Sequence, residues 1–269
     1  MASLDQIIDT ILAHPRFSGQ TFDAQTFIAS LDEETLEQLF REIQEEEERE
    51  RYSLFARMFP DDGPYRRALY PRHMELFSAG AAYMERLFMA GNRVGKTRAG
   101  AYESTCHLTG QYPTWWDGRF FTNPIAAWVA GDTNETTRDI LQKELLGEVT
   151  WGEDGRKTMD GSGMIPRDCI GRISWKRGVD DLVDKCLIKH RTGRWSNLAF
   201  KSYDQGRRVF QGTAKHLIWL DEECPMDVYG ECLIRLATTR GLMLSTFTPL
   251  KGLSEVVLSY MPEDMRPAA

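Results

Sequence analysis

The chain has 269 residues, 42% of them hydrophobic and 27% charged, which is ordinary for a globular protein able to bury a full core. Its start, Met1-Ala2-Ser3-Leu4-Asp5, lacks the basic and apolar segments of a signal peptide, and no apolar run reaches membrane-spanning length. The formal net charge of −7 conceals a segregation: residues 32–50 hold ten acidic and two basic residues, whereas residues 156–208 hold thirteen Lys or Arg and six Asp. The basic stretch predicts either a face for phosphate backbones or ordinary solvated surface.

The cysteine pattern argues against a zinc site. The five cysteines are odd in number, scattered, and form no Cys-x-x-Cys pair; they are Cys106, Cys169, Cys186, Cys224 and Cys232. We therefore expect free thiols in a reducing cytosol.

Residues 1–60 predict a helical arm outside the main domain. Apolar residues recur at helical spacing in two sets, which are Ile7, Ile8, Ile11 and Leu12, then Leu36, Leu39, Phe40 and Ile43. Asp32 begins a favourable helix start, and Tyr52, Phe55 and Phe59 extend the apolar stripe beyond the acidic run 45–48. That run predicts the solvated face of a long helix, with a docking site for a partner as the alternative. Turn residues at 61–64 mark the boundary to the main domain.

The main domain alternates between strands and helices. The expected strands are 85–89, 125–130, 170–175, 185–191, 195–203, 216–220 and 242–247, with 185–203 forming a β-hairpin. The expected helices are 72–83, 95–108, 135–146 and 226–236, and the rest of 147–184 is expected to be loops. This alternation predicts an α/β fold, a mostly parallel sheet covered by helices.

One loop carries the Walker A pattern, with alanine in place of the usual first glycine. A glycine-rich turn between a strand and a helix lets backbone N–H groups face a polyphosphate, and the helix N-terminus adds its positive dipole end. Lys96 would reach the β- and γ-phosphates of ATP, and the Thr97 hydroxyl would ligate Mg²⁺. The nucleotide-binding residues expected here are Ala90, Gly91, Asn92, Arg93, Val94, Gly95, Lys96 and Thr97.

A second segment, 216–223, has the Walker B pattern of an apolar strand that ends in carboxylates. Asp221 would hold the water shell of Mg²⁺ beside Thr97, and Glu222 would polarise the attacking water as general base. Taken alone, this segment is equally compatible with a solvated acidic turn. Together the two motifs predict ATP hydrolysis by a P-loop NTPase. The strand at 125–130 lies between the two Walker strands in the sequence, and the base adjoins Asp221, which favours the RecA-like (ASCE) branch.

Three segments together resemble the large terminase subunit of tailed bacteriophages, a family that packages double-stranded DNA into preformed capsids. They are 91–97 with its central Arg93, 218–223, and Ser245-Thr246-Phe247-Thr248-Pro249-Leu250. The resemblance covers about residues 64–260, the ATPase half of such proteins. It implies ATP-driven DNA translocation in the host cell cytoplasm by a homo-oligomeric ring on the procapsid, with portal protein and small terminase subunit as partners. A monomer is the alternative for the isolated chain.

The resemblance also implies roles for single residues. Thr246 matches the coupling motif that senses the γ-phosphate. Tyr70 and His73 stand where the family has an adenine-recognition element of the type Pro-x-Gln, and a solvent-exposed histidine at a helix start is the alternative for His73. For the arginine finger, Arg93 would act within the chain, and Arg208, beside Arg207, would act on a neighbouring subunit. A contact with a phosphate backbone, or a surface pair, is the alternative for Arg207 and Arg208.

Terminase large subunits also carry a C-terminal nuclease. We expect no nuclease activity here, with a helical arm at 1–60, the ATPase domain at 61–255, and only the start of a linker toward an absent nuclease domain at 256–269. Two other functions fit the Walker motifs. A superfamily-2-like helicase or translocase would need a second RecA-like domain, for which residues beyond 250 leave no room. A nucleotide-responsive adaptor without turnover would not need the complete set of Walker side chains.

Overall fold

The computed structural model describes residues 4–14, 24–52, 54–250, 252–261, 264 and 266. Their contacts divide the chain into two compact units, Met1–Ser53 and Leu54–Ala269. In the part of the chain so described, no helix is both long and apolar enough to span a membrane. The five cysteines are buried free thiols, as the sequence predicts.

The first unit is helical, as expected from its apolar spacing. Its helices are α1 (Leu4–Ala13), α2 (Ala24–Ala29) and α3 (Glu33–Tyr52). The Asp32 carboxylate caps α3 by accepting a hydrogen bond from the Thr35 backbone N–H at 2.8 Å. Its core is formed by Ile7, Ile11, Ile28, Leu36 and Ile43. Glu45 and Glu47 on α3 are exposed, in agreement with a solvated acidic face.

The helix continues past the acidic run only as far as Tyr52, so the prediction was wrong for Phe55 and Phe59. Helix α3 ends at Tyr52, and the short α4 (Leu54–Arg57) belongs to the second unit. There Phe59 is buried, with its ring 4.9 Å from that of Tyr102. Helical spacing predicts that a face is covered, but not which part of the chain covers it.

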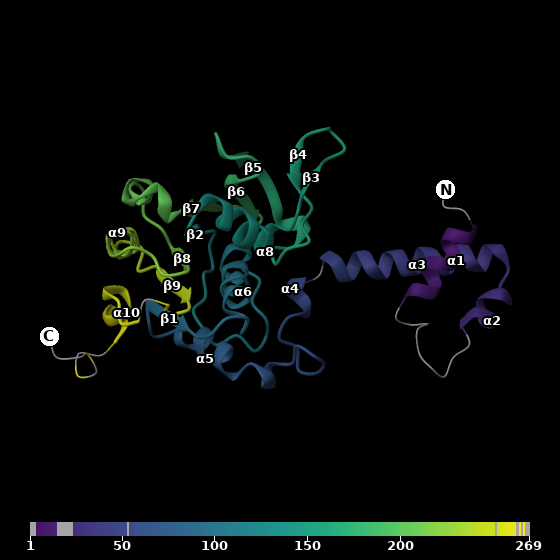
Figure 1. The fold of residues 1–269 in the computed structure, drawn as a ribbon, viewed down its shortest axis with the longest axis horizontal. Coiled ribbons are helices and arrows are strands. Elements are labelled where there is room, and N and C mark those ends of the chain that lie inside the picture. Colours follow the sequence, from purple (N-terminus) through teal and green to yellow (C-terminus); the bar gives the residue numbers. More distant parts are fainter. Residues whose placement is uncertain are drawn as a thin grey trace. The chain divides into compact units, whose positions relative to one another are not determined.

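The second unit contains a seven-stranded sheet with the order β1-β9-β8-β2-β7-β6-β5 (Figure 1). The strands are β1 (Glu85–Met89), β2 (Ala126–Gly131), β5 (Ile170–Trp175), β6 (Val183–Lys189), β7 (Trp195–Ser202), β8 (Leu217–Asp221) and β9 (Leu242–Phe247). Neighbouring strands from β1 to β7 pair in parallel, whereas β7-β6 and β6-β5 pair antiparallel. The mostly parallel sheet and the β6–β7 hairpin are confirmed. Because β9 lies between the strand before the Walker A loop and the Walker B strand, the arrangement is RecA-like.

Helices cover both faces of the sheet, and the sheet separates two hydrophobic cores. The longer ones are α5 (Pro71–Ala79), α6 (Lys96–Thr109), α9 (Met226–Ala237) and α10 (Glu255–Tyr260), and the short helices are η2 (Arg67–Leu69), η4 (Arg167–Cys169), η5 (Tyr203–Gln205) and η6 (Arg207–Phe210). Successive residues of β8 alternate between the cores: Trp219 packs in the core that includes residues of α6, and Ile218 in the core that includes residues of α9. The buried strands therefore hold the loops at their ends in fixed positions.

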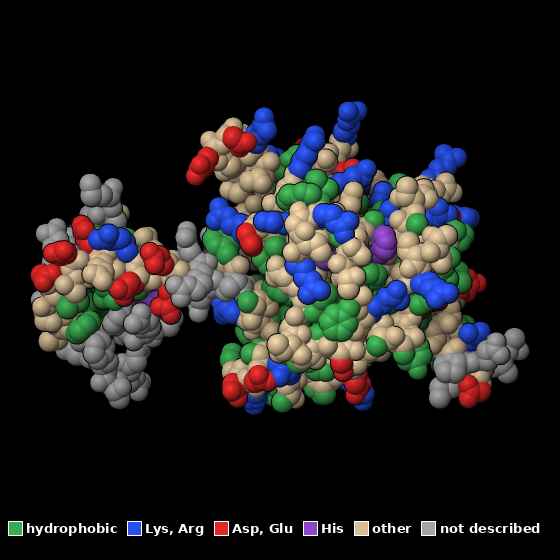
Figure 2. All heavy atoms as spheres, turned by 180° about the vertical axis from the view of Figure 1, so that it is seen from behind, with side chains coloured by type: hydrophobic (Ala, Val, Ile, Leu, Met, Phe, Trp, Pro, Cys, Tyr) green, Lys and Arg blue, Asp and Glu red, His purple; other side chains and the backbone are tan. Residues whose placement is uncertain are grey.

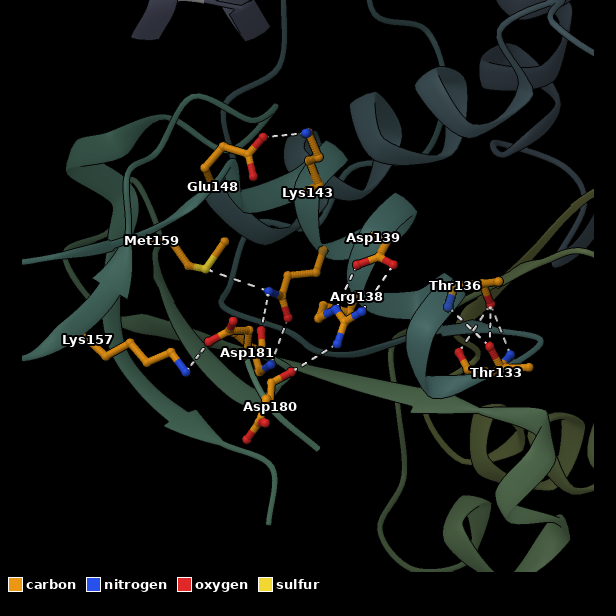
Figure 3. A network of polar contacts seen from close by, with 12 residues as sticks. Thr133, Thr136, Arg138, Asp139, Lys143, Glu148, Lys157, Met159, Asp180 and Asp181 are labelled. Atoms are coloured by element: carbon orange, nitrogen blue, oxygen red, sulfur yellow. Dashed lines mark hydrogen bonds and ion pairs between the residues drawn. The ribbon is translucent and has the colours of Figure 1, made fainter. Parts of the chain in front are cut away.

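The segment expected as one helix at 135–146 begins as α7 (Asn134–Thr136), continues as the π-helical η3 (Thr137–Gln142) and ends as α8 (Lys143–Leu146). The region expected to be loops also forms a small hairpin of β3 (Val149–Trp151) and β4 (Lys157–Met159). Figure 3 shows how polar contacts join these parts. Arg138 donates to the Asp180 carbonyl at 3.2 Å, and Lys157 forms an ion pair with Asp181.

Two glycines inside helices give a matched test of the packing of α6 on the sheet. A Cβ atom at Gly100 would lie 2.2 Å from Cε2 of Trp219, whereas nothing lies within 4 Å of one at Gly230 in α9. We expect Gly100→Ala to lower the free energy of unfolding by about 1–3 kcal/mol through overpacking. Gly230→Ala should raise it by about 0.5–1 kcal/mol through helix propensity. Urea denaturation measures both, and equal shifts of the same sign would contradict the packing described here.

Candidate nucleotide-binding site

The Walker A loop leaves the end of β1 and enters the first turn of α6. Parallel pairing continues to the loop entry, where the Ala90 N–H donates to the Phe247 carbonyl at 3.4 Å. The loop then turns through left-handed backbone at Arg93 (φ 62°) and Gly95 (φ 84°). Gly95 relieves strain at that φ, and a Cβ there would also lie 3.1 Å from the His73 ring. The loop therefore has the strand–turn–helix setting that the motif requires.

Lys96 folds back over the loop and is buried. Its Nζ donates to the carbonyls of Ala90 at 3.1 Å and Gly91 at 2.7 Å, and to the Thr248 hydroxyl at 3.0 Å. The Thr248 hydroxyl oxygen also lies 2.9 Å from Oδ1 of Asn92. Thr248 thus connects the end of β9 to the loop. Sequence motifs assign Thr248 no role, although it directly follows β9, a strand that ends beside the loop.

Asp221 ends β8 within reach of the first helical turn of α6. Its two carboxylate oxygens lie 3.4 and 3.5 Å from the Thr97 hydroxyl. Burial raises the pKa of Asp221 to about 7, while the hydrogen bond from Thr246 and the charge of Lys96 act in the opposite direction. A hydroxyl beside a carboxylate fits Mg²⁺, which typically uses one or two protein oxygens together with waters and substrate phosphates. A bound dication would favour the ionised carboxylate.

Thr246 lies at the centre of a chain of hydrogen bonds. Its hydroxyl donates to Oδ1 of Asp221 at 2.5 Å and accepts from the Trp219 indole N–H at 2.7 Å. All three side chains are buried, and residues 221 and 246 are direct partners in the β8–β9 register. The indole therefore fixes which way the Thr246 hydroxyl points. Trp219 is a site-supporting residue that we had interpreted only as part of an apolar strand.

Glu222 follows in a strained backbone conformation with φ 64°. Its N–H donates to the Thr246 carbonyl at 2.9 Å, and the buried Tyr203 hydroxyl lies 3.2 Å from the Glu222 carbonyl and 2.9 Å from that of Asp221. Such strain persists only where the surroundings hold it, and it is common at functional sites. The Glu222 side chain is exposed at the site, and partial burial raises its pKa against the lowering effect of Lys96. Tyr203 lies outside both Walker motifs, directly after β7, so no sequence motif pointed to it.

A cavity of about 340 Å³ lies beside the loop. Among its lining residues are Tyr70, His73, Arg93, Gly95 and Arg98. His73 is buried, its Nε2 lies 3.3 Å from the Gly95 carbonyl oxygen, and burial lowers its pKa, so the alternative of a solvent-exposed histidine was wrong. The structure thus brings both expected adenine-contacting residues to one cavity at the Walker A loop.

The candidate arginines differ in their surroundings. Arg93 lines that cavity and is exposed. Arg207 forms an ion pair with the buried Glu231 of α9 at 2.9 Å, and Arg208 is exposed on η6 without an ion pair among the described residues. Of the three, only Arg93 lies at the loop.

A RecA-like sheet with a Walker A loop, a strand-end carboxylate beside its threonine, and an adjoining glutamate defines a P-loop NTPase. The family model for "Terminase large subunit, T4likevirus-type, N-terminal" matches residues 87–269, and the chain belongs to the large terminase subunit family. It is 38% identical over 249 residues to the terminase large subunit of Salmonella phage P22, covering 86% of this chain and 46% of that protein. The chain thus spans about half the length of this curated relative.

Two solved structures of the large terminase from a thermophilic bacteriophage are also similar. Crystal form 2 of that protein aligns with a TM-score of 0.43 and 11% identity over 65% of this chain and 38% of the phage chain. Crystal form 3, a complex with ADP, aligns with a TM-score of 0.42 and 13% identity over the same shares.

Proposed function

We propose that this chain is the ATP-hydrolysing part of a large terminase subunit, which uses ATP with Mg²⁺ to drive double-stranded DNA into a procapsid in the host cytoplasm. The observation that carries the proposal is the convergence of Lys96, Thr97, Asp221 and Glu222 beyond the carboxyl ends of the parallel strands β1 and β8, which flank β9. We place the ATPase domain boundary at Leu54 rather than at residue 61, because α4 and Phe59 belong to the second unit, and we propose that the helical arm before it is available for partners.

In this proposal the backbone N–H groups of 91–95 and the Lys96 ammonium bind the phosphates. To do so, Lys96 exchanges its contacts with Ala90 and Gly91 for phosphate oxygens. Thr97 and Asp221 hold Mg²⁺, which supplies neutralisation of charge on the β- and γ-phosphates. Glu222 accepts the proton of the attacking water, and Tyr70 and His73 position the adenine. Arg93 stabilises the transferring phosphoryl group, and Arg208 remains the candidate finger toward a neighbouring subunit.

We assign to Thr246 the coupling of ATP hydrolysis to movement of the chain, because its hydroxyl joins Asp221 of the metal site to β9. Loss of the γ-phosphate would change the surroundings of Asp221 and, through this hydrogen bond, the position of the β9 end. Thr248 lies two residues further and contacts Lys96, so both polar side chains at this strand end face the same site. Portal protein, small terminase subunit and other copies of the chain in a ring are the proposed partners.

Lys96→Ala tests the proposal most directly. We expect ATP hydrolysis to fall about 10²–10³-fold, since a phosphate-stabilising donor is lost from the transition state. Lys143→Ala is the control, because that lysine is 58% exposed on α8 and pairs with Glu148 on the surface. Hydrolysis is measured as phosphate release with excess Mg²⁺, and again after chelation, which should stop it. Equal rates for both variants would reject the proposal in favour of an adaptor.

A helicase differs from a packaging motor in what stimulates it. We expect hydrolysis to be stimulated by duplex DNA together with procapsids that carry a portal, without separation of DNA strands. Strand displacement from a forked duplex in the absence of procapsids would instead support the helicase alternative.

A further inference from the structure

One side of the sheet is open over β6 and β7. Their residues Cys186, Ile188, Leu198 and Phe200 point to the core that includes residues of α6, and α9 packs on β8 and β9 on the other side. On that other side, Lys185, Lys189, Trp195 and Asn197 are exposed. Figure 2, which views the molecule from behind, shows many Lys and Arg side chains across the middle of the second unit, with Asp and Glu mostly near its margins.

Four lysines and two tryptophans on this side of the sheet form what we call the lysine face: the exposed Lys185, Lys189 and Trp195, the half-buried Lys201, and the buried Lys215 and Trp128 beneath them. Sheet register places them together, because Lys185 and Trp128 both pair with Ala199, and Lys189 pairs with Trp195. The Nζ atoms of Lys215 and Lys201 lie 4.8 and 5.6 Å from the centroid of the Trp128 ring. The ring therefore holds two ammonium groups at one place on the sheet.

A glycine on β5 leaves room for the side chain of Trp195. A Cβ atom at Gly171 on β5 would lie 2.4 Å from Cζ3 of the Trp195 ring, so the ring lies across β6 onto a glycine. The ring is nevertheless 49% exposed. This exposed ring, beside Lys189 in the register, extends the surface that a partner would contact.

The positive charges of this face are not neutralised within the chain. Among the described residues, none of its four lysines forms an ion pair with a carboxylate. Burial lowers the pKa of Lys215, and the like charges of Lys201 and Lys185 lower it further. Asp184 is the acidic group that acts on Lys201 in the opposite direction. Mutual repulsion of this kind is relieved when an anionic partner binds.

By contrast, several basic residues of the stretch 156–208 already have acidic partners. Lys157 pairs with Asp181, Arg156 with Asp154, and Arg207 with Glu231. The basic stretch seen in the sequence is therefore not one surface. Its unpaired members on β6 and β7 come together with Lys215, which lies outside it.

We propose that the lysine face binds the phosphate backbone of double-stranded DNA. The inference rests on the proposed function as a DNA motor, and it names the surface that the substrate contacts. Lys185 and Lys189 are four residues apart on one strand, or about 13 Å, a distance that spans several phosphates of a duplex. Lysine ammonium groups can bind phosphates, which carry no sequence information, and a motor that must move along any sequence needs contacts of this kind.

The double variant Lys185→Gln/Lys189→Gln tests the lysine face. The control is the double variant Lys143→Gln/Arg156→Gln, which also loses two positive charges. The control side chains are 58% and 87% exposed and lie on α8 and beside the β3–β4 hairpin. Binding of the full chain to a 30-bp duplex of mixed sequence is followed by fluorescence anisotropy at several salt concentrations, without ATP. We expect the test variant to bind about 60-fold more weakly at 0.1 M salt, with the slope of log K against log salt reduced by about 1.8, at 0.9 per lost contact.

The proposal predicts the same weakening for duplexes of unrelated sequence, and unchanged basal ATP hydrolysis in both variants. Unchanged DNA binding by the test variant would overturn it and favour an acidic protein surface as the partner. An equal loss in the control variant would also overturn it, since only net charge would then matter. Because binding is measured without nucleotide, these outcomes are separate from those for Lys96→Ala, which address hydrolysis.

Discussion

Replacing Glu222 with glutamine is expected to abolish turnover of ATP while leaving ATP binding intact. The amide keeps the size of the side chain but cannot accept a proton from water, so the general base is lost. Removal of such a base costs about 10²–10⁴-fold in rate. The backbone at Glu222 is held by Thr246 and Tyr203 through main-chain atoms, which the substitution leaves unchanged. Single-turnover hydrolysis and equilibrium binding of ATP measure the two effects separately.

Glu223→Gln is the matched control, because it removes the neighbouring carboxylate by the same chemical change. The side chain of Glu223 has no hydrogen bond or ion pair recorded in the described part of the chain, and we expect its loss to change the rate less than threefold, or by under about 0.7 kcal/mol. Equal hydrolysis by wild type and Glu222→Gln would show that another group activates water. Equal losses in both variants would instead point to the total negative charge at this strand end.

Local sequence patterns predicted the elements around the site well. Strands 85–89 and 242–247 were expected with the bounds that the structure has, and the Walker B strand was expected one residue early. Short apolar runs bounded by glycine, proline or carboxylates carry this information within a few residues. The three-residue strands β3 and β4 were missed because they are too short to show alternation.

Contacts between strands could not be predicted in the same way. The hydrogen bonds that join Trp219, Thr246 and Asp221 depend on the register of β8 against β9, which no local pattern encodes. Thr246 was found through the family resemblance alone, and Tyr203 was not found at all. Likewise, the charge of residues 156–208 could be counted, but only the sheet shows which lysines share a face.

A buried ion pair between distant parts of the sequence stabilises the strand and the helix on either side of the Walker A loop. Arg86 on β1 and Glu103 on α6 form a buried ion pair, so the strand before the loop is joined to the helix after it. Arg86 also donates to the Leu76 carbonyl at 2.7 Å, and His107 lies 3.2 Å from Oε1 of Glu103. The three side chains are close to fully buried, at 5%, 1% and 0% exposure.

We expect Glu103→Ala to lower the free energy of unfolding by about 3–5 kcal/mol, because it leaves the Arg86 charge buried without its partner. Glu75→Ala is the control, since its ion pair with Arg72 is on the surface, and it should cost less than about 1 kcal/mol. Arg86→Met/Glu103→Leu removes both charges and should be more stable than Glu103→Ala. Urea denaturation at pH 7 measures all three, and a double variant less stable than the single one would contradict this account.

The same network makes stability depend on pH in two windows. Burial alone would raise the pKa of Glu103, but the charge of Arg86 and the hydrogen bonds from His107 and Arg86 lower it to about 2 from 4.5. The contribution of this carboxylate is therefore complete above about pH 4.5 and is lost as the pH falls toward 2, because the unfolded chain takes up the proton first. Burial lowers the pKa of His107 despite the opposing effect of Glu103, so stability also falls as the pH drops below about 6.5, where the histidine of the unfolded chain becomes charged.

In Glu103→Gln the lower pH window should disappear, so the difference in stability between wild type and variant should shrink between pH 5 and pH 3. A difference that stays constant over that range would show that Glu103 is not held ionised by Arg86.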